Sequence, residues 1–289
     1  MMRKALFIAL ALCFALFQAR AQVDLEKEFF SLPDTVTNEY LDSLTVQVAR
    51  PNDYWMVGGY GGASVQMGYF NPDRDAKMQW AWPVYGVSFI RHFTMFGVFP
   101  NMGLEFGAQM NYEGYEYSTN PETGYRPVEP KSGAYKLVMQ VPEAFILSHF
   151  HVDMGEHFKL LAKLGIYGGY RLNISRTLDP GYENNELYTK NQYSFMEHER
   201  RLTYGVQGGI GVGLMFSPFE VHLNAQVKWG WESFWEPDYM SQYYYRFAYP
   251  LDGAITLGVY YQLTPRYGHT RAQLKKLAKK MIEEQKKSE

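Results

Sequence analysis

The sequence predicts an all-β fold: an eight-stranded antiparallel transmembrane up-and-down β-barrel with an N-terminal periplasmic leader and a C-terminal amphipathic helix. Segments that alternate between apolar and small or polar residues recur along the chain, which is typical of strands with two different faces. Most of these segments run for ten residues or more, whereas strands of soluble proteins have about 5–6 residues and tilted membrane strands need about 9–11. The gaps between them are alternately short and long, as in transmembrane barrels.

The composition excludes several other classes of protein. The 289 residues are 46% hydrophobic and 17% aromatic, which is too apolar for a disordered chain. A mean hydropathy of −0.34 is too polar for a bundle of membrane helices. The net charge of −2 gives no reason to expect a nucleic-acid partner. The single cysteine, Cys13, excludes a disulfide scaffold and a cysteine zinc site.

The first part of the chain has the pattern of an export signal. Two basic residues precede an apolar run from Ala5 to Phe17, and a small-x-small cleavage site ends at Ala21. Residues 1–21 are therefore predicted to be a signal peptide. Residues 22–53 are expected to form a periplasmic N-terminal segment, either a flexible leader or one that docks through Phe29, Phe30 and Leu32.

The barrel is expected to span residues 54–264. The predicted strands are 54–69, 83–93, 101–116, 134–150, 158–174, 201–216, 219–232 and 246–263. The gaps at 94–100, 151–157 and 217–218 are short, and those at 70–82, 117–134, 175–200 and 233–245 are long. An even number of strands places both termini on the short-turn side, which is periplasmic in outer-membrane barrels. Within 134–150, the pair Pro142-Glu143 predicts a bulge or register shift, because proline cannot donate to the ladder.

The size of the side chains on the two faces predicts which face meets lipid. In 202–216 the even positions are large and apolar, and the odd positions are mostly glycine. Glycine suits a narrow interior, so we favour a membrane barrel over the alternative, a soluble lipocalin-like barrel with its faces reversed. Aromatic residues near both ends of the strands predict two interfacial girdles. The outer girdle is expected at Trp80, Trp82, Tyr112, Tyr115, Tyr170, Trp229, Trp231, Phe247 and Tyr249, and the inner one at Phe93, Phe150, Phe158, Phe216, Phe219 and Tyr261.

Charged residues on the polar faces predict a filled lumen. The interior of an eight-stranded barrel is only wide enough for side chains. Four acids and four bases balance there, so we expect them to pair and neutralise one another. They are Glu105, Glu113, Lys159, Lys163, Arg171, Glu220, Lys228 and Asp252. A narrow channel remains an alternative, although a selective pore would show an excess of one sign.

A cluster around residue 150 carries residue types used in catalysis and metal binding. Ser148 and His149 could act as nucleophile and base, and His149, His151 and His157 with Asp153 resemble a metal site. However, Ser148 and His149 are adjacent and must point to opposite faces of a strand. They also lie at a short turn, away from outer-leaflet lipid. We interpret the cluster as turn and interface residues and predict no catalytic residue, metal or cofactor. An outer-leaflet lipid-modifying enzyme stays the alternative.

Three stretches resemble a known family. Val141-Pro142-Glu143, the glycine-rich run 164–170 and the run 204–211 resemble the middle hairpin and the following strand of PorT-like, OmpA-like eight-stranded outer-membrane barrels of Bacteroidota. The resemblance covers about residues 54–264. It implies an outer-membrane location and no catalytic residue, and some members are similar to parts of secretion or barrel-assembly machinery.

Function is therefore expected on the loops and tails, as a structural or accessory subunit of an envelope assembly or secretion complex. The expected partners are outer-membrane lipid and an envelope protein. In the aromatic loop 233–245, the interaction candidates are Trp235, Tyr239, Tyr243 and Tyr244. Residues 265–289 predict a basic amphipathic periplasmic helix, whose apolar stripe includes Leu274, Leu277, Met281 and Ile282.

Overall fold

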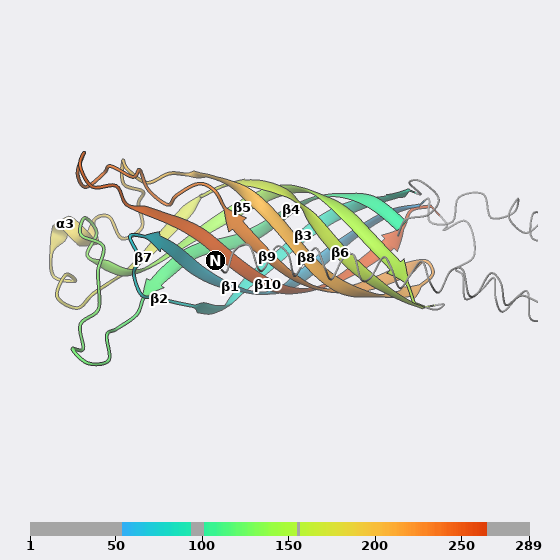
Figure 1. Ribbon diagram of the computed structural model, residues 1–289, viewed down its shortest axis with the longest axis horizontal. Helices are drawn as coiled ribbons and strands as arrows, with labels where there is room; N and C mark the ends of the chain where they lie inside the picture. Colours follow the sequence, from blue (N-terminus) through green and yellow to red (C-terminus); the bar gives the residue numbers. More distant parts are fainter. Residues whose placement is uncertain (1–53, 94–100, 155–156, 265–289) are drawn as a thin grey trace, which may run out of the picture. The chain divides into compact units, whose positions relative to one another are not determined.

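The computed structural model describes residues 54–93, 101–154 and 157–264, and eight long strands form a closed barrel there (Figure 1). They are β1 (Trp55–Asn71), β3 (Gln79–Phe93), β4 (Asn101–Tyr117), β5 (Ala134–Asp153), β6 (Phe158–Tyr170), β8 (Leu202–Phe216), β9 (Phe219–Gly230) and β10 (Phe247–Gln262). Each predicted segment matches one of them, so the predicted fold class is confirmed.

The sheet is antiparallel throughout and closes on itself. The long strands pair in chain order, and β1 pairs with β10 from Met56↔Gln262 to Asn71↔Phe247. Since each long strand has a neighbour on both sides, the ring leaves no long edge unpaired. Among the described residues, no helix is both long and apolar enough to cross a membrane.

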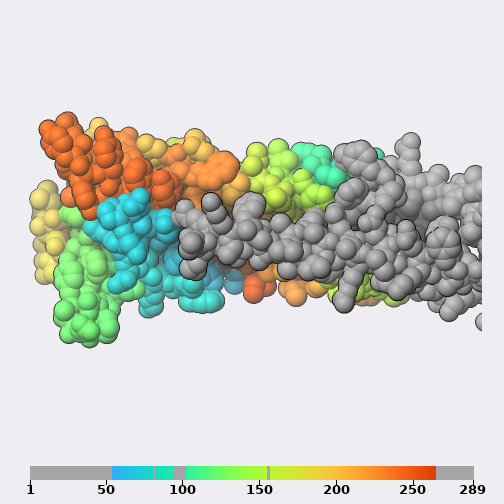
Figure 2. All heavy atoms as spheres, in the orientation of Figure 1, coloured from blue at the N-terminus to red at the C-terminus, as the bar shows by residue number. Residues whose placement is uncertain are grey.

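The connections at the two ends of the barrel differ. The long connections between strands gather at one end (left in Figure 1), whereas β8 and β9 are joined at the other end by Ser217 and Pro218 alone. Figure 2 shows loop atoms from near residue 125, in green, and near residue 245, in orange, standing out at the long-loop end. The alternation of short and long connections is thus present in the fold.

Three short elements belong to the long-loop end: β2 (Ala76–Lys77), β7 (Asn173–Leu178) and α3 (Glu186–Thr189). β2 pairs with the end of β4, and β7 pairs with the first residues of β5. The fifth predicted strand, 158–174, was therefore too long. β6 pairs with both β5 and β8 and ends at Tyr170. After a break at residues 171–172 the chain continues beside β5 as β7, without a pairing to β8.

The bulge or register shift predicted at Pro142 is present on one edge of β5 and absent on the other. The register between β4 and β5 runs without a shift from Asn101↔His151 to Glu116↔Lys136. On the other edge of β5, pairing with β6 starts at Glu143 and pairing with β7 ends at Gln140. Val141 and Pro142 thus lie opposite three residues, 170–172, so the register on this edge shifts by one residue where β5 changes neighbour.

The predicted facing of the strands is confirmed. On β8, Leu202, Ile210 and Phe216 are exposed on the outside, while the intervening odd residues Thr203 and Gln207 are buried inside. β9 follows the same rule, with Val227 outside and Lys228 inside. Large apolar residues outside and polar ones inside are the arrangement of a barrel in lipid, opposite to that of a soluble barrel.

This arrangement reverses near the long-loop end of β5. Between Glu143 and His151 three of the five inward residues are charged or polar, and outward residues such as Ile146 and Val152 are exposed and apolar. Before Pro142, by contrast, Leu137 and Met139 face inward, and polar residues such as Gln140 face outward. The first part of β5 therefore has the pattern of a sheet surrounded by water.

The same reversal on β4 corrects one girdle prediction. Glu113 faces the lumen, and Tyr115, two residues further on, must share its face. Tyr115 is accordingly buried among inward aromatic side chains and takes no part in an outer girdle, whereas Trp80, Trp229 and Trp231 are exposed outside.

Several predictions concern residues outside the described ranges. They are the signal peptide 1–21, the segment 22–53, the short turn 94–100 and the helix at 265–289 with Leu274, Leu277, Met281 and Ile282.

Candidate functional site

The lumen is filled by successive layers of ion pairs, and the first lies near the short-turn end. The ammonium group of Lys159 contacts the carboxylate of Glu220, and both side chains are fully buried. Tyr54 donates its hydroxyl to Glu220 at 3.0 Å, and Gln262 donates its amide at 2.9 Å. Nε2 of His222 lies 3.0 Å from Oε2 of the same carboxylate, so the buried charge of Glu220 is satisfied by Lys159 and three further groups.

The second layer centres on Glu105. Lys163 Nζ lies 2.6 Å from its Oε2, and Ser88 donates its hydroxyl to Oε1 at 2.9 Å. The ring nitrogen Nδ1 of His149 lies 3.3 Å from the same Oε2. This layer links an ion pair to a buried histidine.

The third layer contains one base between two acids. Lys228 contacts the carboxylate of Glu143, and its Nζ lies 3.3 Å from Oδ2 of Asp252. Gln109 donates its amide to Glu143 at 2.6 Å, and Asn111 donates to Asp252 at 3.3 Å. Sequence reasoning missed Glu143, because facing could not be assigned beyond Pro142; an unbroken alternation through the proline would have placed it inside.

The fourth layer joins the lumen to the loops. Arg171 Nε donates to Glu113 at 2.9 Å, and Thr203 donates its hydroxyl to the same carboxylate at 2.9 Å. Arg171 also donates to the backbone carbonyl of Arg200 at 2.8 Å, and its guanidinium lies 5.0 Å from the ring of Phe234. All eight charged residues predicted from the sequence thus line the lumen, and the structure brings each acid against one of the bases.

An aromatic plug lies beyond these layers. It consists of Phe70, Tyr115, Tyr117, Leu137, Met139, Val141, Ile174, Phe234, Trp235 and Ala248. Trp235 is only 2% exposed, and its indole N–H donates to the carbonyl of Arg246 at 3.2 Å. Its interpretation as a surface interaction residue is wrong, because the loop after β9 returns over the barrel mouth and carries Phe234 and Trp235 inward.

A polar cluster covers the plug. Tyr239 donates its hydroxyl to Glu129, and Arg246 contacts both residues, with 2.9 Å between Nη1 and the tyrosine oxygen. Burial, followed by the charge of Glu129, raises the pKa of Tyr239. The ring of His198 stacks on Tyr239 with 4.5 Å between centroids. Burial, then Lys131 and Arg176, lowers the pKa of His198 to about 4.

The outermost residues of the same loop remain exposed. Tyr243 is 94% exposed, and Tyr244 and Tyr245 are more than half exposed. Of the four interaction candidates in this loop, Trp235 and Tyr239 build the barrel closure, and Tyr243 and Tyr244 are available on the surface. Such a set of neighbouring tyrosines is typical of surfaces that bind other molecules.

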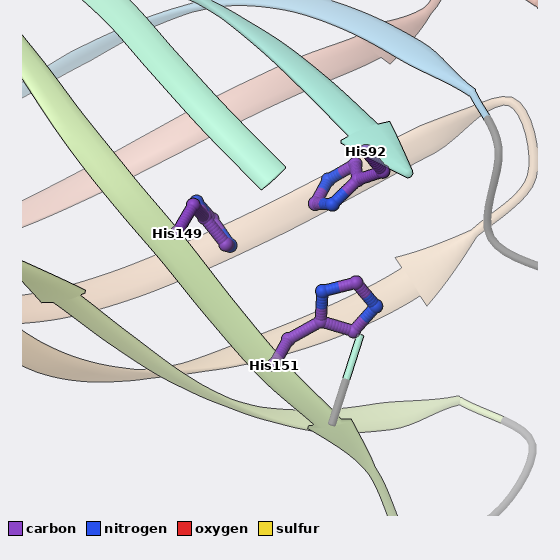
Figure 3. Close-up of side chains that lie close together, drawn as sticks. All are labelled: His92, His149 and His151. Atoms are coloured by element: carbon purple, nitrogen blue, oxygen red, sulfur yellow. The ribbon is translucent and has the colours of Figure 1, made fainter. Parts of the chain in front are cut away.

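The predicted cluster around residue 150 is divided by the fold. Ser148 points outward and His149 inward, as adjacent residues in a strand must. His157 is exposed and stacks on Phe216, so it does not join His149 and His151. The structure brings His92 of β3 to them instead (Figure 3). Sequence reasoning missed His92, although its even position on the face of Ser88 and Ile90 was a usable signal.

The closed ring, the apolar outer surface and the polar, packed lumen define a small transmembrane β-barrel. A family model described as "Outer membrane protein beta-barrel domain" matches residues 45–232. The chain belongs to this family, which places it in the outer membrane of a Gram-negative bacterium.

Solved structures of other small barrels are similar to this chain. Ail of Yersinia pestis, solved with the heparin analogue sucrose octasulfate, has 11% identity, a TM-score of 0.35, and coverage of 73% of this chain and 99% of that one. OprG of Pseudomonas aeruginosa has 12% identity, a TM-score of 0.41, and coverage of 74% and 98%. Neisserial surface protein A has 8% identity, a TM-score of 0.38, and coverage of 72% and 96%. No curated protein matches the chain.

Proposed function

We propose that this barrel is a closed, non-enzymatic structural or accessory subunit of an envelope assembly or secretion complex, acting through its loops and periplasmic segments. The observation that carries the proposal is the filling of the lumen by ion-pair layers and an aromatic plug. A lumen filled in this way leaves the loops and tails as the parts that can contact partners. Outer-membrane lipid surrounds the barrel, and an envelope protein is the partner.

The separation of Ser148 and His149 on opposite faces supports the absence of acyl-transfer chemistry, since a nucleophile and its base must come within hydrogen-bond reach. The stretches 141–143, 164–170 and 204–211 support a finer placement among PorT-like barrels of Bacteroidota. We further propose an orientation for the barrel in the membrane. The short turns and both termini are periplasmic, and the long loops are extracellular.

Planar-bilayer recordings test the closed lumen. The purified, refolded barrel is expected to show no large, stable conductance, while a general porin refolded in the same way serves as the positive control. Steady open channels in the barrel would show that the ion-pair layers leave a path and would favour the channel alternative.

Single-cysteine labelling of whole cells tests the orientation. The only cysteine, Cys13, lies in the predicted signal peptide, so each variant carries one thiol after cleavage. Thr119→Cys, Glu183→Cys and Asp238→Cys are expected to react with a membrane-impermeant reagent on intact cells. Ser217→Cys, which is exposed at the short-turn end, is expected to react only after the outer membrane is breached. Reaction of Ser217→Cys on intact cells inverts the orientation.

Proximity cross-linking tests the role of the exposed tyrosines. A variant with Tyr243, Tyr244 and Tyr245 replaced by alanine is expected to lose cross-links to its envelope partner. Tyr193→Ala, which removes a tyrosine 73% exposed on another loop, is the matched control. An unchanged cross-link pattern in the triple variant excludes this loop as the contact.

A further inference from the structure

Three imidazoles converge inside the barrel near the short-turn end (Figure 3). They belong to His92 on β3 and to His149 and His151 on β5, and all three are buried. One ring nitrogen from each lies within 4.8 Å of the other two. None of the ion-pair layers requires this arrangement, although Glu105 contacts His149.

The strand register explains why these residues meet. His149 and His151 are two residues apart, so both imidazoles point into the lumen. His92 and His149 lie in the same row across the sheet, each paired with Gly103 of the intervening strand β4. A Cβ atom at Gly103 would lie 3.1 Å from Nδ1 of His92 and 2.7 Å from the carbonyl oxygen of Arg91. Glycine at this position leaves room for the imidazole between the two strands.

The free nitrogen atoms point to a ligand. Both ring nitrogens of His92 and Nε2 of His149 are buried and have no hydrogen-bond partner among the described residues. Buried polar atoms without a partner are costly, and each calls for an explanation. A bound metal ion would occupy the one lone pair of the neutral His92 imidazole and the lone pair on Nε2 of His149.

A carboxylate already orients one of the imidazoles. Oε2 of Glu105 lies 3.3 Å from Nδ1 of His149, so the hydrogen bond is made by Nδ1–H and the lone pair falls on Nε2. Metal-binding histidines in proteins commonly have their second nitrogen bonded to a carboxylate in this way. Oδ1 of Asp153 lies 4.0 Å from Nε2 of His151 and adds a second negative charge beside the cluster.

We infer that His92, His149 and His151 form a binding site for a divalent d-block cation of the zinc class, within the periplasmic end of the lumen. Three neutral imidazoles suit Zn²⁺, which binds nitrogen at about 2.0–2.1 Å with tetrahedral geometry. In tetrahedral coordination the ligand nitrogens lie about 3.4 Å apart. Rotation of the imidazole rings would bring the three nitrogens, which lie within 4.8 Å of one another, to this spacing. Three protein ligands leave the fourth position to water. The ion would tie β3 to β5 across β4.

Zinc binding by the purified protein tests the site. The full chain is produced without a polyhistidine tag, stripped with a chelator, and titrated with Zn²⁺ in detergent. One zinc per barrel is expected by elemental analysis, and Co²⁺ is expected to give the intense visible absorption of a tetrahedral site. His92→Gln, His149→Gln and His151→Gln should each lower the zinc affinity by more than about 100-fold, beyond the effect of losing an outer-shell partner.

Two further histidines provide matched controls. His157→Gln alters an exposed histidine at the same end of the barrel, and His198→Gln alters one at the other end; both should bind zinc as the unmodified chain does. Heat-modifiable gel mobility reports whether each variant has folded. If a ligand variant fails to fold, X-ray absorption spectroscopy of the zinc-loaded unmodified protein counts the imidazole ligands instead. Three imidazole nitrogens bound to zinc would support the site. Fewer imidazoles, no stoichiometric zinc, or full affinity in His92→Gln would overturn it.

Discussion

The two parts of β5, on either side of Pro142, place their apolar residues on opposite faces of the strand. On the short-turn side of Pro142, Glu143 and His149 face the lumen while Ile146 faces outward. On the long-loop side, Leu137 and Met139 face inward. The inner face of β5 is therefore apolar on one side of Pro142 and more polar on the other. The inner face of its neighbour β4 changes in the same direction, from the charged Glu113 to the aromatic Tyr115.

The difference teaches that the solvent around a strand decides which face is apolar. In lipid, outward apolar residues are required and the interior must hold polar groups that satisfy one another. Beyond the bilayer, water surrounds the strand, so burial of apolar residues inside is again favourable. The reversal near Pro142 is therefore expected to mark the boundary of the membrane at the long-loop end of β5.

The largest expected effect comes from breaking the third ion-pair layer. Lys228→Met removes the charge that faces Glu143 and Asp252 and leaves two buried carboxylates without a base. We expect a loss of about 3–5 kcal/mol in the free energy of unfolding. Urea titration in lipid vesicles, followed by gel mobility, measures it.

Lys77→Met is the matched control for this change. Lys77 lies 3.7 Å from Glu116, but its side chain is 66% exposed, so the expected loss is below about 1 kcal/mol. Equal stability of Lys228→Met and the unmodified barrel would show that the lumen charges do not hold the strands together.

A second change tests the position of the membrane edge. Ile146→Arg and Gln140→Arg place the same charge on the same outward face of β5, six residues apart. Arginine costs about 2–4 kcal/mol near the bilayer midplane and about 0–1 kcal/mol near the interface. Ile146→Arg should therefore destabilise the vesicle-inserted barrel and Gln140→Arg hardly at all. Similar losses in both variants would contradict the reversal at Pro142.

A smaller effect is expected in the polar cluster over the plug. Tyr239→Phe removes the hydroxyl that donates to Glu129 and accepts from Arg246. Hydrogen bonds to charged groups contribute about 1.5–3 kcal/mol, and a half-buried site falls at the lower end of this range. Faster hydrogen exchange in residues 233–246, with the membrane strands unaffected, is the expected readout. Tyr243→Phe, on an exposed residue of the same loop, should change nothing.

The smallest effect is a pH dependence of the same cluster. The folded-state pKa of His198 is about 4, below the ordinary value of 6.5, so the unfolded loop binds a proton first as the pH falls. The contribution of His198 to stability is thus complete above about pH 6.5 and is lost as the pH falls toward 4. Hydrogen exchange of the loop at pH 7 and pH 5 measures it, and His198→Gln should abolish the difference.

The membrane part of the fold was predictable because lipid imposes a strict period of two. Glycine with Thr203 and Gln207 on one face of 202–216 and mainly large apolar residues on the other left one arrangement for β8. The same period identified the eight lumen charges, since seven lie on the polar face of a regular strand and Arg171 directly follows β6. The pairing of Lys228 with Glu143 depended on the strand that contains Pro142, where the expected bulge stopped the reasoning.

The water-exposed end was less predictable, because alternation alone does not say where the membrane stops. Tyr115 and Trp235 were placed in an outer girdle and on a loop surface, and the fold buries both. For Tyr115 the period of two from Glu113 did indicate the inward face, whereas the loop sequence around Trp235 has no strand period that could indicate burial. His92 was missed for a different reason: it is 57 residues from His149 in the chain, and only the register through Gly103 brings them together.

The pairing of β1 with β10 has a consequence for biogenesis. β1 leaves the ribosome first among the strands, yet one of its two neighbours, β10, is translated after all the others. A chain that terminated before Phe247 would present to hydrocarbon the backbone donors and acceptors of β1 that face β10, where they cannot be satisfied. The ring can therefore close only after the last strand, through Gln262, has been translated.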